Sequence, residues 1–254
     1  NHLIDTVYFG GGTPSILDRK ELSIIINSIV QNFNLVNDPE ITIEANPEDI
    51  NSDKITDWHN MGVNRVSLGV QALNNYHLKY MNRAHDREQA LNSLTVLKKS
   101  KINNINIDLI YGFPGLTHSD WRNTLNNIIM FNISHVSCYC LTVEDKAPLY
   151  HFIKKKKYQP LSSSQGRDQF MIAREVLIKN NFIQYEISNF SKPGFQSQHN
   201  QNYWNRTPYL GVGPSAHSFN RNIRQWNICH NISYCKKIES DQIQLILHYG
   251  KRRI

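Results

Sequence analysis

The chain has 254 residues, with 28 Lys and Arg against 21 Asp and Glu, a net charge of +7 and a pI near 9.2. This length suffices for one large domain or two ordinary ones with a packed core. Four cysteines are too few for a disulfide framework, and no apolar run approaches the roughly 20 residues that span a bilayer. These numbers exclude a disulfide-rich secreted scaffold and a transmembrane protein. They indicate the cytoplasm and leave peripheral association with a membrane open.

The positive charge by itself does not predict a nucleic-acid partner. A surface that binds nucleic acid gathers Lys and Arg on one face among aromatic residues, and the only dense basic run covers residues 154–157. The chain is also rich in Asn, Ile and Lys, whose codons are A/T-rich, so codon bias accounts for the charge. We therefore expect a solvated lysine loop and no specific nucleic-acid partner.

The first two thirds of the chain alternate short apolar runs with longer helical stretches. The β-branched runs predict strands over residues 6–9, 41–45, 65–68, 104–110 and 135–141. The stretches between and after them predict helices over residues 19–32, 52–60, 85–100, 119–131 and 164–180. The first of these helices carries a predicted buried stripe at i, i+3, i+4 and i+7, made of Leu22, Ile25, Ile26 and Ile29.

Strands that alternate with helices form right-handed crossovers and a parallel sheet. Five such strands predict an α/β fold, either a barrel or a doubly wound sheet, with the functional residues at the carboxyl ends of the strands. Beyond about residue 185 the periodic pattern gives way to Gly, Pro, Asn, Gln and aromatic residues. A boundary there predicts two segments, residues 1–186 and 187–254.

Three glycines and a threonine, residues 10–13, come directly after the first predicted strand. Glycine lets the backbone bend sharply and lets a ligand approach without interference from a Cβ atom. No Gly-Lys-Ser/Thr follows, and no G-x-G-x-x-G opens a helix, so the loop has neither common phosphate-binding motif. Gly11 and Gly12 therefore predict backbone contact with a ligand that carries a carboxylate or an amine.

Four polar residues stand in or after the next strands. Glu44 needs a polar partner if it is buried, although a solvated strand-end Glu explains that residue equally well. Gln71 offers a planar amide and Arg83 a fork for a carboxylate. Asp108 lies inside an Ile/Leu strand, and a ribose diol is one natural partner for a buried aspartate. Together these residues predict a cradle for a nucleoside with an amino-acid tail.

The segments that carry these residues resemble the radical S-adenosylmethionine (SAM) superfamily. They are residues 8–15 (YFGGGTPS), 44–47 (EANP), 62–71 (GVNRVSLGVQ) and 108–114 (DLIYGFP). Over about residues 5–240 the chain is similar to the oxygen-independent coproporphyrinogen III oxidase family, which includes HemN and HemW. The resemblance implies a partial parallel (β/α) barrel lacking its first strand, followed by the start of a smaller C-terminal domain. It also implies a SAM site made of Gly11, Gly12, Thr13, Glu44, Gln71, Arg83 and Asp108.

Residues 199–204 (HNQNYW) resemble the His-Asn-x-x-Tyr-Trp signature of the HemW branch, whose members are haem chaperones. Residues 185–190, 192–194 and 209–218 fit the same branch. The resemblance implies that haem and a haem-acceptor protein are partners, and that His199 is a candidate iron ligand in a haem site with Asn200, Tyr203 and Trp204. A neutral imidazole suits iron, but a packed or hydrogen-bonded histidine remains the interpretation for His217.

The cluster motif of radical SAM proteins is not in the sequence. A [4Fe–4S] cluster with one iron open for SAM requires Cys-x3-Cys-x2-Cys, because thiolates at loop spacing hold the other irons. The four cysteines lack this spacing, and we interpret them as small buried hydrophobic residues: Cys138, Cys140, Cys229 and Cys235. The resemblance places the cluster loop before Asn1. We therefore expect an N-terminally truncated fragment that performs no radical chemistry alone and whose full-length form carries the cluster.

Three functions remain as hypotheses. The leading one is a haem chaperone of the HemW branch. The second is the oxidase itself, which decarboxylates coproporphyrinogen III in porphyrin biosynthesis, and the third is a degenerate SAM-fold protein that keeps a binding role. Residues 242–254 do not resemble the family, and the sequence leaves open whether the chain is an enzyme.

Overall fold

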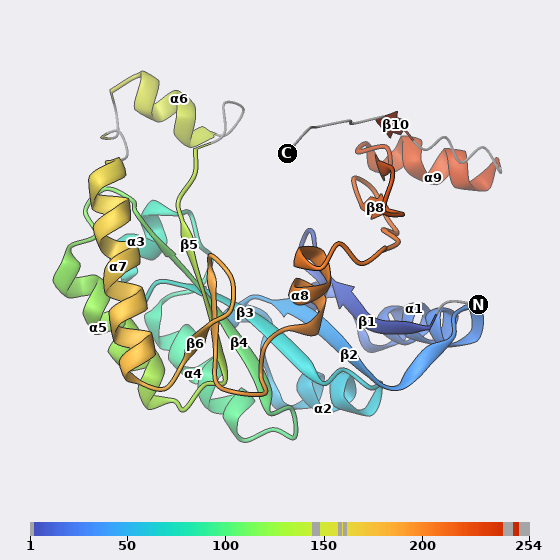
Figure 1. Cartoon of the computed structure of the whole chain (residues 1–254), viewed down its shortest axis with the longest axis horizontal. Helices are drawn as coiled ribbons and strands as arrows, with labels where there is room; N and C mark the ends of the chain where they lie inside the picture. The colour runs from blue at the N-terminus through green and yellow to red at the C-terminus, as the bar shows by residue number, and fades with distance from the viewer. Residues whose placement is uncertain (1–2, 144–147, 157–158, 160–161, 241–245, 249–254) are drawn as a thin grey trace. The chain divides into compact units, whose positions relative to one another are not determined.

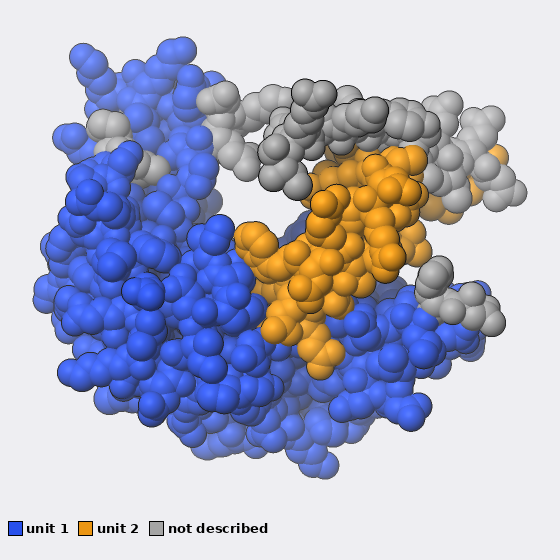
Figure 2. Space-filling model, in the orientation of Figure 1, with its two compact units in different colours: residues 1–196 blue, residues 197–254 orange. Residues whose placement is uncertain are grey.

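The computed structural model describes residues 3–143, 148–156, 159, 162–240 and 246–248. The chain divides into two compact units, residues 1–196 and 197–254 (Figure 2). Residues 187–196 lie in the first unit, because the strand β7 (Asn189–Ser191) pairs with strands of that unit. The predicted functional division into residues 1–186 and 187–254 stays a prediction.

The first unit contains a mostly parallel sheet in the order β1-β2-β3-β4-β5-β7-β6 (Figure 1). Its parallel strands are β1 (Ile4–Phe9), β2 (Leu35–Ala45), β3 (Arg65–Gln71), β4 (Asn104–Tyr111) and β5 (His135–Cys140). β7 pairs antiparallel with β5 and with β6 (Ile183–Gln184). The predicted parallel α/β sheet is confirmed. The β6–β7 hairpin was not predicted, because strands of two and three residues are too short to show alternation.

The helices follow the strands as the sequence predicts. The predicted helices are α1 (Arg19–Asn32), α2 (Ser52–Asn60), α4 (Arg87–Lys98), α5 (His118–Met130) and α7 (Ser163–Lys179). α1 begins where it does because Asp18 and Glu21 form a capping box, in which each side chain accepts a hydrogen bond from the other's backbone N–H. The structure adds the short helices α3 (Asn75–Tyr80) and α6 (Pro148–Lys154).

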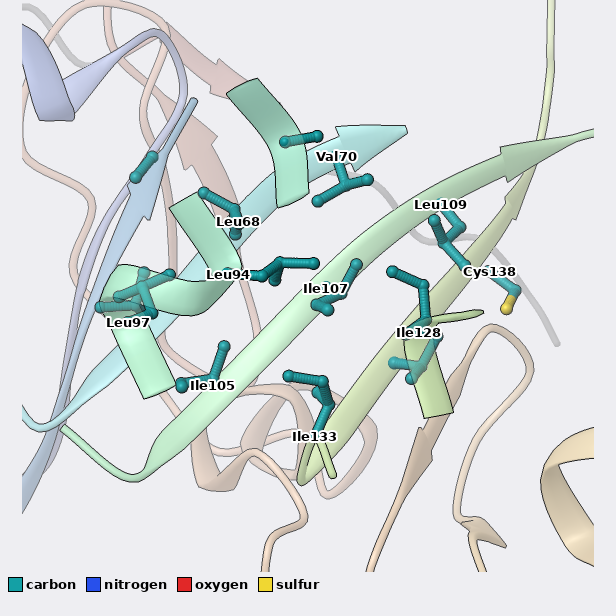
Figure 3. Packing of buried hydrophobic residues seen from close by; sticks show 14 of the residues in the cluster. Leu68, Val70, Leu94, Leu97, Ile105, Ile107, Leu109, Ile128, Ile133 and Cys138 are labelled. Carbon is teal, nitrogen blue, oxygen red and sulfur yellow. The ribbon is translucent and has the colours of Figure 1, made fainter. Parts of the chain in front are cut away.

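The apolar core of the first unit lies on one face of the sheet. Ile107 of β4 and Leu68 of β3 are fully buried against Leu94 of α4 (Figure 3). All five predicted helices contribute to this same cluster of side chains. Crossovers that place their helices on one face are typical of a (β/α) barrel, whereas a doubly wound sheet carries helices on both faces.

The predicted buried stripe of α1 is partly wrong. Leu22 and Ile26 are buried, but Ile25 is 39% exposed and Ile24 is 60% exposed. Among the described strands β1 lies at the edge of the sheet, and of the predicted stripe Leu22 and Ile26 belong to the buried core cluster. The pattern of four apolar residues therefore predicted a wider buried face on α1 than the structure has.

The opposite face of the sheet is polar. Side chains alternate between the two faces of a strand, so the neighbours of the core residues point away from the helices. They form a buried polar row across β3, β4 and β5, made of Arg65, Ser67, Asn106, His135 and Ser137. This face holds the site described below.

The second unit contains a small antiparallel sheet in the order β10-β9-β8 and two helices. Its elements are α8 (Gln198–Trp204), β8 (His217–Phe219), β9 (Arg224–Trp226), α9 (Asn231–Glu239) and β10 (Ile246–His248). In neither unit does a described helix have the length and apolar character needed to cross a bilayer.

The prediction of buried cysteines holds for one of the four. Cys138 is 1% exposed and packs in the core. Cys140 ends the same strand beyond the core, and Cys229 and Cys235 lie on the surface of the second unit, so all three are exposed. All four thiols are free.

Truncation of a core side chain should destabilise the first unit strongly. Ile107→Ala removes methyl groups at the centre of the sheet and leaves a cavity, so we expect a loss of about 2–5 kcal/mol in the free energy of unfolding. Ile24→Ala makes the same change at an exposed position and is expected to stay within about 0.5 kcal/mol of wild type. Urea unfolding measures both, and equal losses would contradict the assigned core.

Candidate functional site

The glycine loop after β1 is fixed to the end of β2 through Glu44. The hydroxyl of Tyr8 donates to Glu44 Oε1 at 2.9 Å, and the backbone N–H of Gly11 donates to Glu44 Oε2 at 3.2 Å. Burial raises the pKa of Glu44, and these two hydrogen bonds oppose the rise. Burial and the Glu44 charge also raise the pKa of Tyr8, so that the phenol keeps its proton as a donor. Glu44 is therefore a partnered carboxylate and not a solvated strand end.

Glycine is required at position 10 because the side chains of Tyr8 and Glu44 lie too close to its backbone to leave room for a Cβ atom. A Cβ atom there would lie 2.7 Å from Tyr8 Cε1 and 2.8 Å from the Glu44 carboxyl group. Gly11 has φ +81°, a left-handed conformation that favours glycine. A Cβ atom on Gly12 would meet no heavy atom within 4 Å, because this glycine faces the open pocket.

Two further contacts hold the loops around the pocket. The buried Ser15 hydroxyl donates to Asp49 Oδ2 at 2.6 Å, which joins the loop after β1 to the loop after β2. His85 lies between Glu48 Oε2 at 3.2 Å and the carbonyl oxygen of Val70 at 3.1 Å. A carbonyl oxygen only accepts, so His85 Nε2 carries a hydrogen. These contacts fix the ends of β2 and β3 relative to each other.

Gln71 leaves β3 with φ +63°, in the left-handed region that a residue other than glycine seldom adopts. The pairing of β3 with β4 shifts register between Leu68 and Gln71 at the same place. Such irregularities redirect a side chain at the end of a strand. Gln71 lines the pocket as a result.

Asp108 is surrounded by donors on the polar face of the sheet. Asn106 Nδ2 donates to Asp108 Oδ1 at 2.8 Å, and the Ser67 hydroxyl donates to Asp108 Oδ2 at 3.0 Å. Burial raises the pKa of Asp108, and hydrogen bonds from Asn106, Ser137 and Ser67 oppose that rise. Asp108 keeps some exposure and lines the pocket, so its remaining lone pairs are available to a ligand.

Arg83 supplies the positive charge of the site. Its Nε atom is buried and has no hydrogen-bond partner among the described residues. Burial lowers the pKa of Arg83, and the charges of Glu48 and Asp108 oppose that effect. A buried guanidinium donor without a partner is costly, and a carboxylate on a bound ligand would satisfy it.

These residues meet in one cavity of about 220 Å³ at the carboxyl ends of β2, β3 and β4. Six of the seven predicted SAM residues line it: Gly12, Thr13, Glu44, Gln71, Arg83 and Asp108. Gly11 is not in the lining and acts through its bond to Glu44. The prediction omitted Ser15, Asn46, Ser67 and Gly69, which also line the cavity. Strand alternation could have identified Ser67. It lies between Val66 and Leu68, whose side chains point into the core, so its own side chain points to the opposite face.

The predicted haem residues lie on α8 of the second unit. His199 and Tyr203 are one helical turn apart, so their side chains meet on one face, with His199 Nε2 3.0 Å from the Tyr203 hydroxyl. Tyr203 packs edge-on against Tyr209, and Tyr203 and Trp204 are 49% and 58% exposed. The backbone N–H of Asn200 donates to Ser197 Oγ at the start of the helix.

His217 lies on β8 and not on α8. Its ring packs against Trp226 of β9, with 5.6 Å between the ring centroids. His217 is exposed apart from this ring contact, and its interpretation as a packed or hydrogen-bonded histidine stays a prediction.

The fold and the cavity define a class of protein. The fold is a mostly parallel sheet with helices on one face and a polar cavity at the carboxyl ends of its strands, the place where (β/α) barrels carry their sites. Residues 1–128 match the Radical SAM superfamily. The chain belongs to the radical SAM superfamily, whose members use SAM and a [4Fe–4S] cluster.

Relatives and solved structures extend this similarity. "Heme chaperone HemW" of Lactococcus lactis subsp. lactis (strain IL1403) is 36% identical over 223 residues, 88% of this chain and 59% of the relative. "Radical S-adenosyl methionine domain-containing protein 1, mitochondrial" of Danio rerio is 33% identical over 214 residues, 84% of this chain and 48% of the relative. The similarity to the solved structure of coproporphyrinogen III oxidase (HemN) from Escherichia coli extends over 98% of this chain and 60% of the oxidase chain. It has a TM-score of 0.81 at 23% identity and shows the same fold.

The cysteines of this chain do not fit the iron–sulfur cluster of the superfamily. Cys138 is buried in the core, and the other three thiols are dispersed over the end of β5 and the second unit. Within the described parts of both units, no group of three His, Cys, Asp or Glu side chains could hold a metal ion. The described residues of this chain therefore do not supply the ligands of such a cluster.

Alanine substitutions at two glycines of the loop should differ in their effect on the free energy of unfolding. Gly10→Ala forces a Cβ atom against Tyr8 and Glu44, so we expect a loss of about 1–3 kcal/mol in the free energy of unfolding. Gly12→Ala meets no neighbour and is expected to stay within about 0.5 kcal/mol of wild type. Urea unfolding decides, and an equal loss in both variants would contradict the geometry of the loop.

Proposed function

We propose that this chain is the SAM-binding and haem-binding part of a haem chaperone of the HemW type. The observation that carries the proposal is the single cavity in which Glu44, Gln71, Arg83 and Asp108 meet the glycine loop. The chain spans about half to three fifths of the relatives named HemW or radical SAM domain-containing protein 1. The proposal therefore concerns the binding sites that these residues form.

The cavity suits the two ends of SAM. The Arg83 guanidinium, whose Nε has no partner among the described residues, suits the carboxylate of an amino acid. The Asp108 carboxylate suits the hydroxyl donors of a ribose. Gly12 and Thr13 leave room for the backbone of the methionine part. When bound, SAM supplies a reactive sulfonium, and the residues of this chain orient it and exclude water.

The α8 residues suit haem by their chemistry. His199 offers an imidazole for axial ligation, and the exposed rings of Tyr203 and Trp204 offer apolar surface for a macrocycle. The Tyr203 hydroxyl is hydrogen-bonded to His199 Nε2, so this hydrogen bond has to break before that atom can ligate iron. Haem supplies the iron, and a haem-acceptor protein is the proposed partner.

Sequence identity favours the chaperone over the oxidase. Relatives named HemW are 31–36% identical to this chain, whereas the oxidase structure is 23% identical and shares the fold. Four free thiols fit a reducing compartment, and we propose the cytoplasm as the location.

Binding of S-adenosylhomocysteine, which keeps the ribose and the amino acid of SAM, tests the cavity. We expect Arg83→Gln to weaken binding about ten- to a hundredfold, because a charged hydrogen bond to the carboxylate is lost. Arg87→Gln makes the same change at an exposed position outside the cavity and should bind as wild type does. Isothermal titration calorimetry measures all three. Equal affinities of Arg83→Gln and wild type would contradict the assignment.

Haem titration tests α8. We expect wild type to shift the Soret band of added haem, and His199→Ala to lose that shift because the axial ligand is gone. Tyr203→Phe frees His199 Nε2 and should bind haem at least as tightly as wild type. His217→Ala removes a histidine of β8 and should leave the spectrum unchanged. A shift that persists in His199→Ala and vanishes in His217→Ala would reverse the two assignments.

A further inference from the structure

A continuous series of side-chain hydrogen bonds runs across the polar face of the sheet and ends on Asp108. The Tyr185 hydroxyl lies 2.7 Å from His135 Nε2, and His135 Nδ1 lies 2.6 Å from Asn106 Oδ1. Asn106 Nδ2 then donates to Asp108 Oδ1 at 2.8 Å. The series begins at Tyr185, which precedes β7, and crosses β5 and β4.

The chemistry of Asn106 fixes the direction of every hydrogen in this series. Its Nδ2 faces the Asp108 carboxylate and the Ser67 hydroxyl oxygen at 2.7 Å, and a carboxylate accepts only. Turning the amide around would set its oxygen against that carboxylate. Asn106 Oδ1 therefore faces His135 and also accepts from the Ser137 hydroxyl at 3.1 Å.

It follows that His135 is neutral and carries its hydrogen on Nδ1. Nδ1 must donate to Asn106 Oδ1, and in a neutral ring Nε2 then carries no hydrogen and accepts from the Tyr185 hydroxyl. His135 is fully buried, and burial lowers its pKa well below the usual value, with the charge of Arg65 adding to the effect. Tyr185, His135 and Asn106 thus form one donor series that points toward the carboxylate.

A donor series in one direction has a physical consequence. In a low-dielectric interior each hydrogen bond polarises the next, so that the final donor is stronger than it would be alone. The series therefore offsets part of the cost of burying the Asp108 charge, and it restrains the carboxylate in one orientation. Asn106 donates to one carboxylate oxygen of Asp108 and Ser67 to the other, and Asp108 also lines the cavity.

We propose that Tyr185 and His135 are positioning residues that act through Asn106 to hold Asp108 as the acceptor for the diol of a ribose. Neither residue lines the cavity. The inference rests on the proposed SAM site and adds two residues to it from β5 and the β6–β7 connection. It gives the polar interior of the sheet a role in ligand affinity.

Tyr185→Phe tests the proposal, because it removes one hydroxyl and keeps the ring that packs edge-on against His135. We expect this variant to bind S-adenosylhomocysteine roughly three- to tenfold more weakly than wild type, the loss of one net hydrogen bond. The difference should vanish for an analogue without the 2′ and 3′ hydroxyls. Tyr76→Phe, at an exposed tyrosine outside the cavity, should bind as wild type does.

Two ligand-free measurements accompany the calorimetry. Long-range ¹H–¹⁵N spectra of the histidines should show His135 neutral with hydrogen on Nδ1. A ¹³C titration of the carboxyl groups should show a higher pKa for Asp108 in Tyr185→Phe than in wild type.

The outcomes separate the two proposals. If wild type does not bind S-adenosylhomocysteine, the SAM site is overturned and the positioning role with it. If wild type binds and Tyr185→Phe matches its affinity, the positioning role alone is overturned. A His135 with hydrogen on Nε2 would also overturn it, since the donor series would then run in the other direction.

Discussion

The cost of placing polar groups on the inner face of a parallel sheet governs the structure of the first unit. The helices cover one face only, so strand alternation leaves Arg65, Asn106 and Asp108 on the other. A buried polar atom without a partner costs about 1–3 kcal/mol. Most of these side chains therefore bond to neighbours on adjacent strands, and the network fixes the strand ends at which the cavity forms.

The cavity keeps some of its polar groups unsatisfied. Arg83 Nε has no partner among the described residues, and Gly12 leaves an open space. Burial raises the pKa values of Glu44 and Asp108 against the hydrogen bonds that support their charged forms. A site of this kind gives up folding stability so that a ligand with a carboxylate and hydroxyl groups can complete it.

The proposed haem site of the second unit depends on a different kind of surface. α8 is short, and Ser197 caps its first turn. His199 and Tyr203 are four residues apart on this helix, so their side chains meet on one face. The exposed rings of this helix need a large flat apolar partner more than a network of hydrogen bonds. The proposed function thus joins a polar site on a sheet with an aromatic site on a helix.

The sequence by itself determined the order of strands and helices, the side of the sheet where ligands bind, and six of the lining residues. Period-two and period-3.6 patterns depend on local geometry, and the strand-end rule holds for every parallel sheet. The sequence could not show that Ile25 is exposed or that three cysteines lie on the surface, because burial depends on which other parts of the chain pack against a residue. Only the tertiary structure decided that Tyr185 and His135 connect to Asp108. His135 and Tyr185 are 50 residues apart in sequence, and the antiparallel pairing of β5 with β7 brings their segments together.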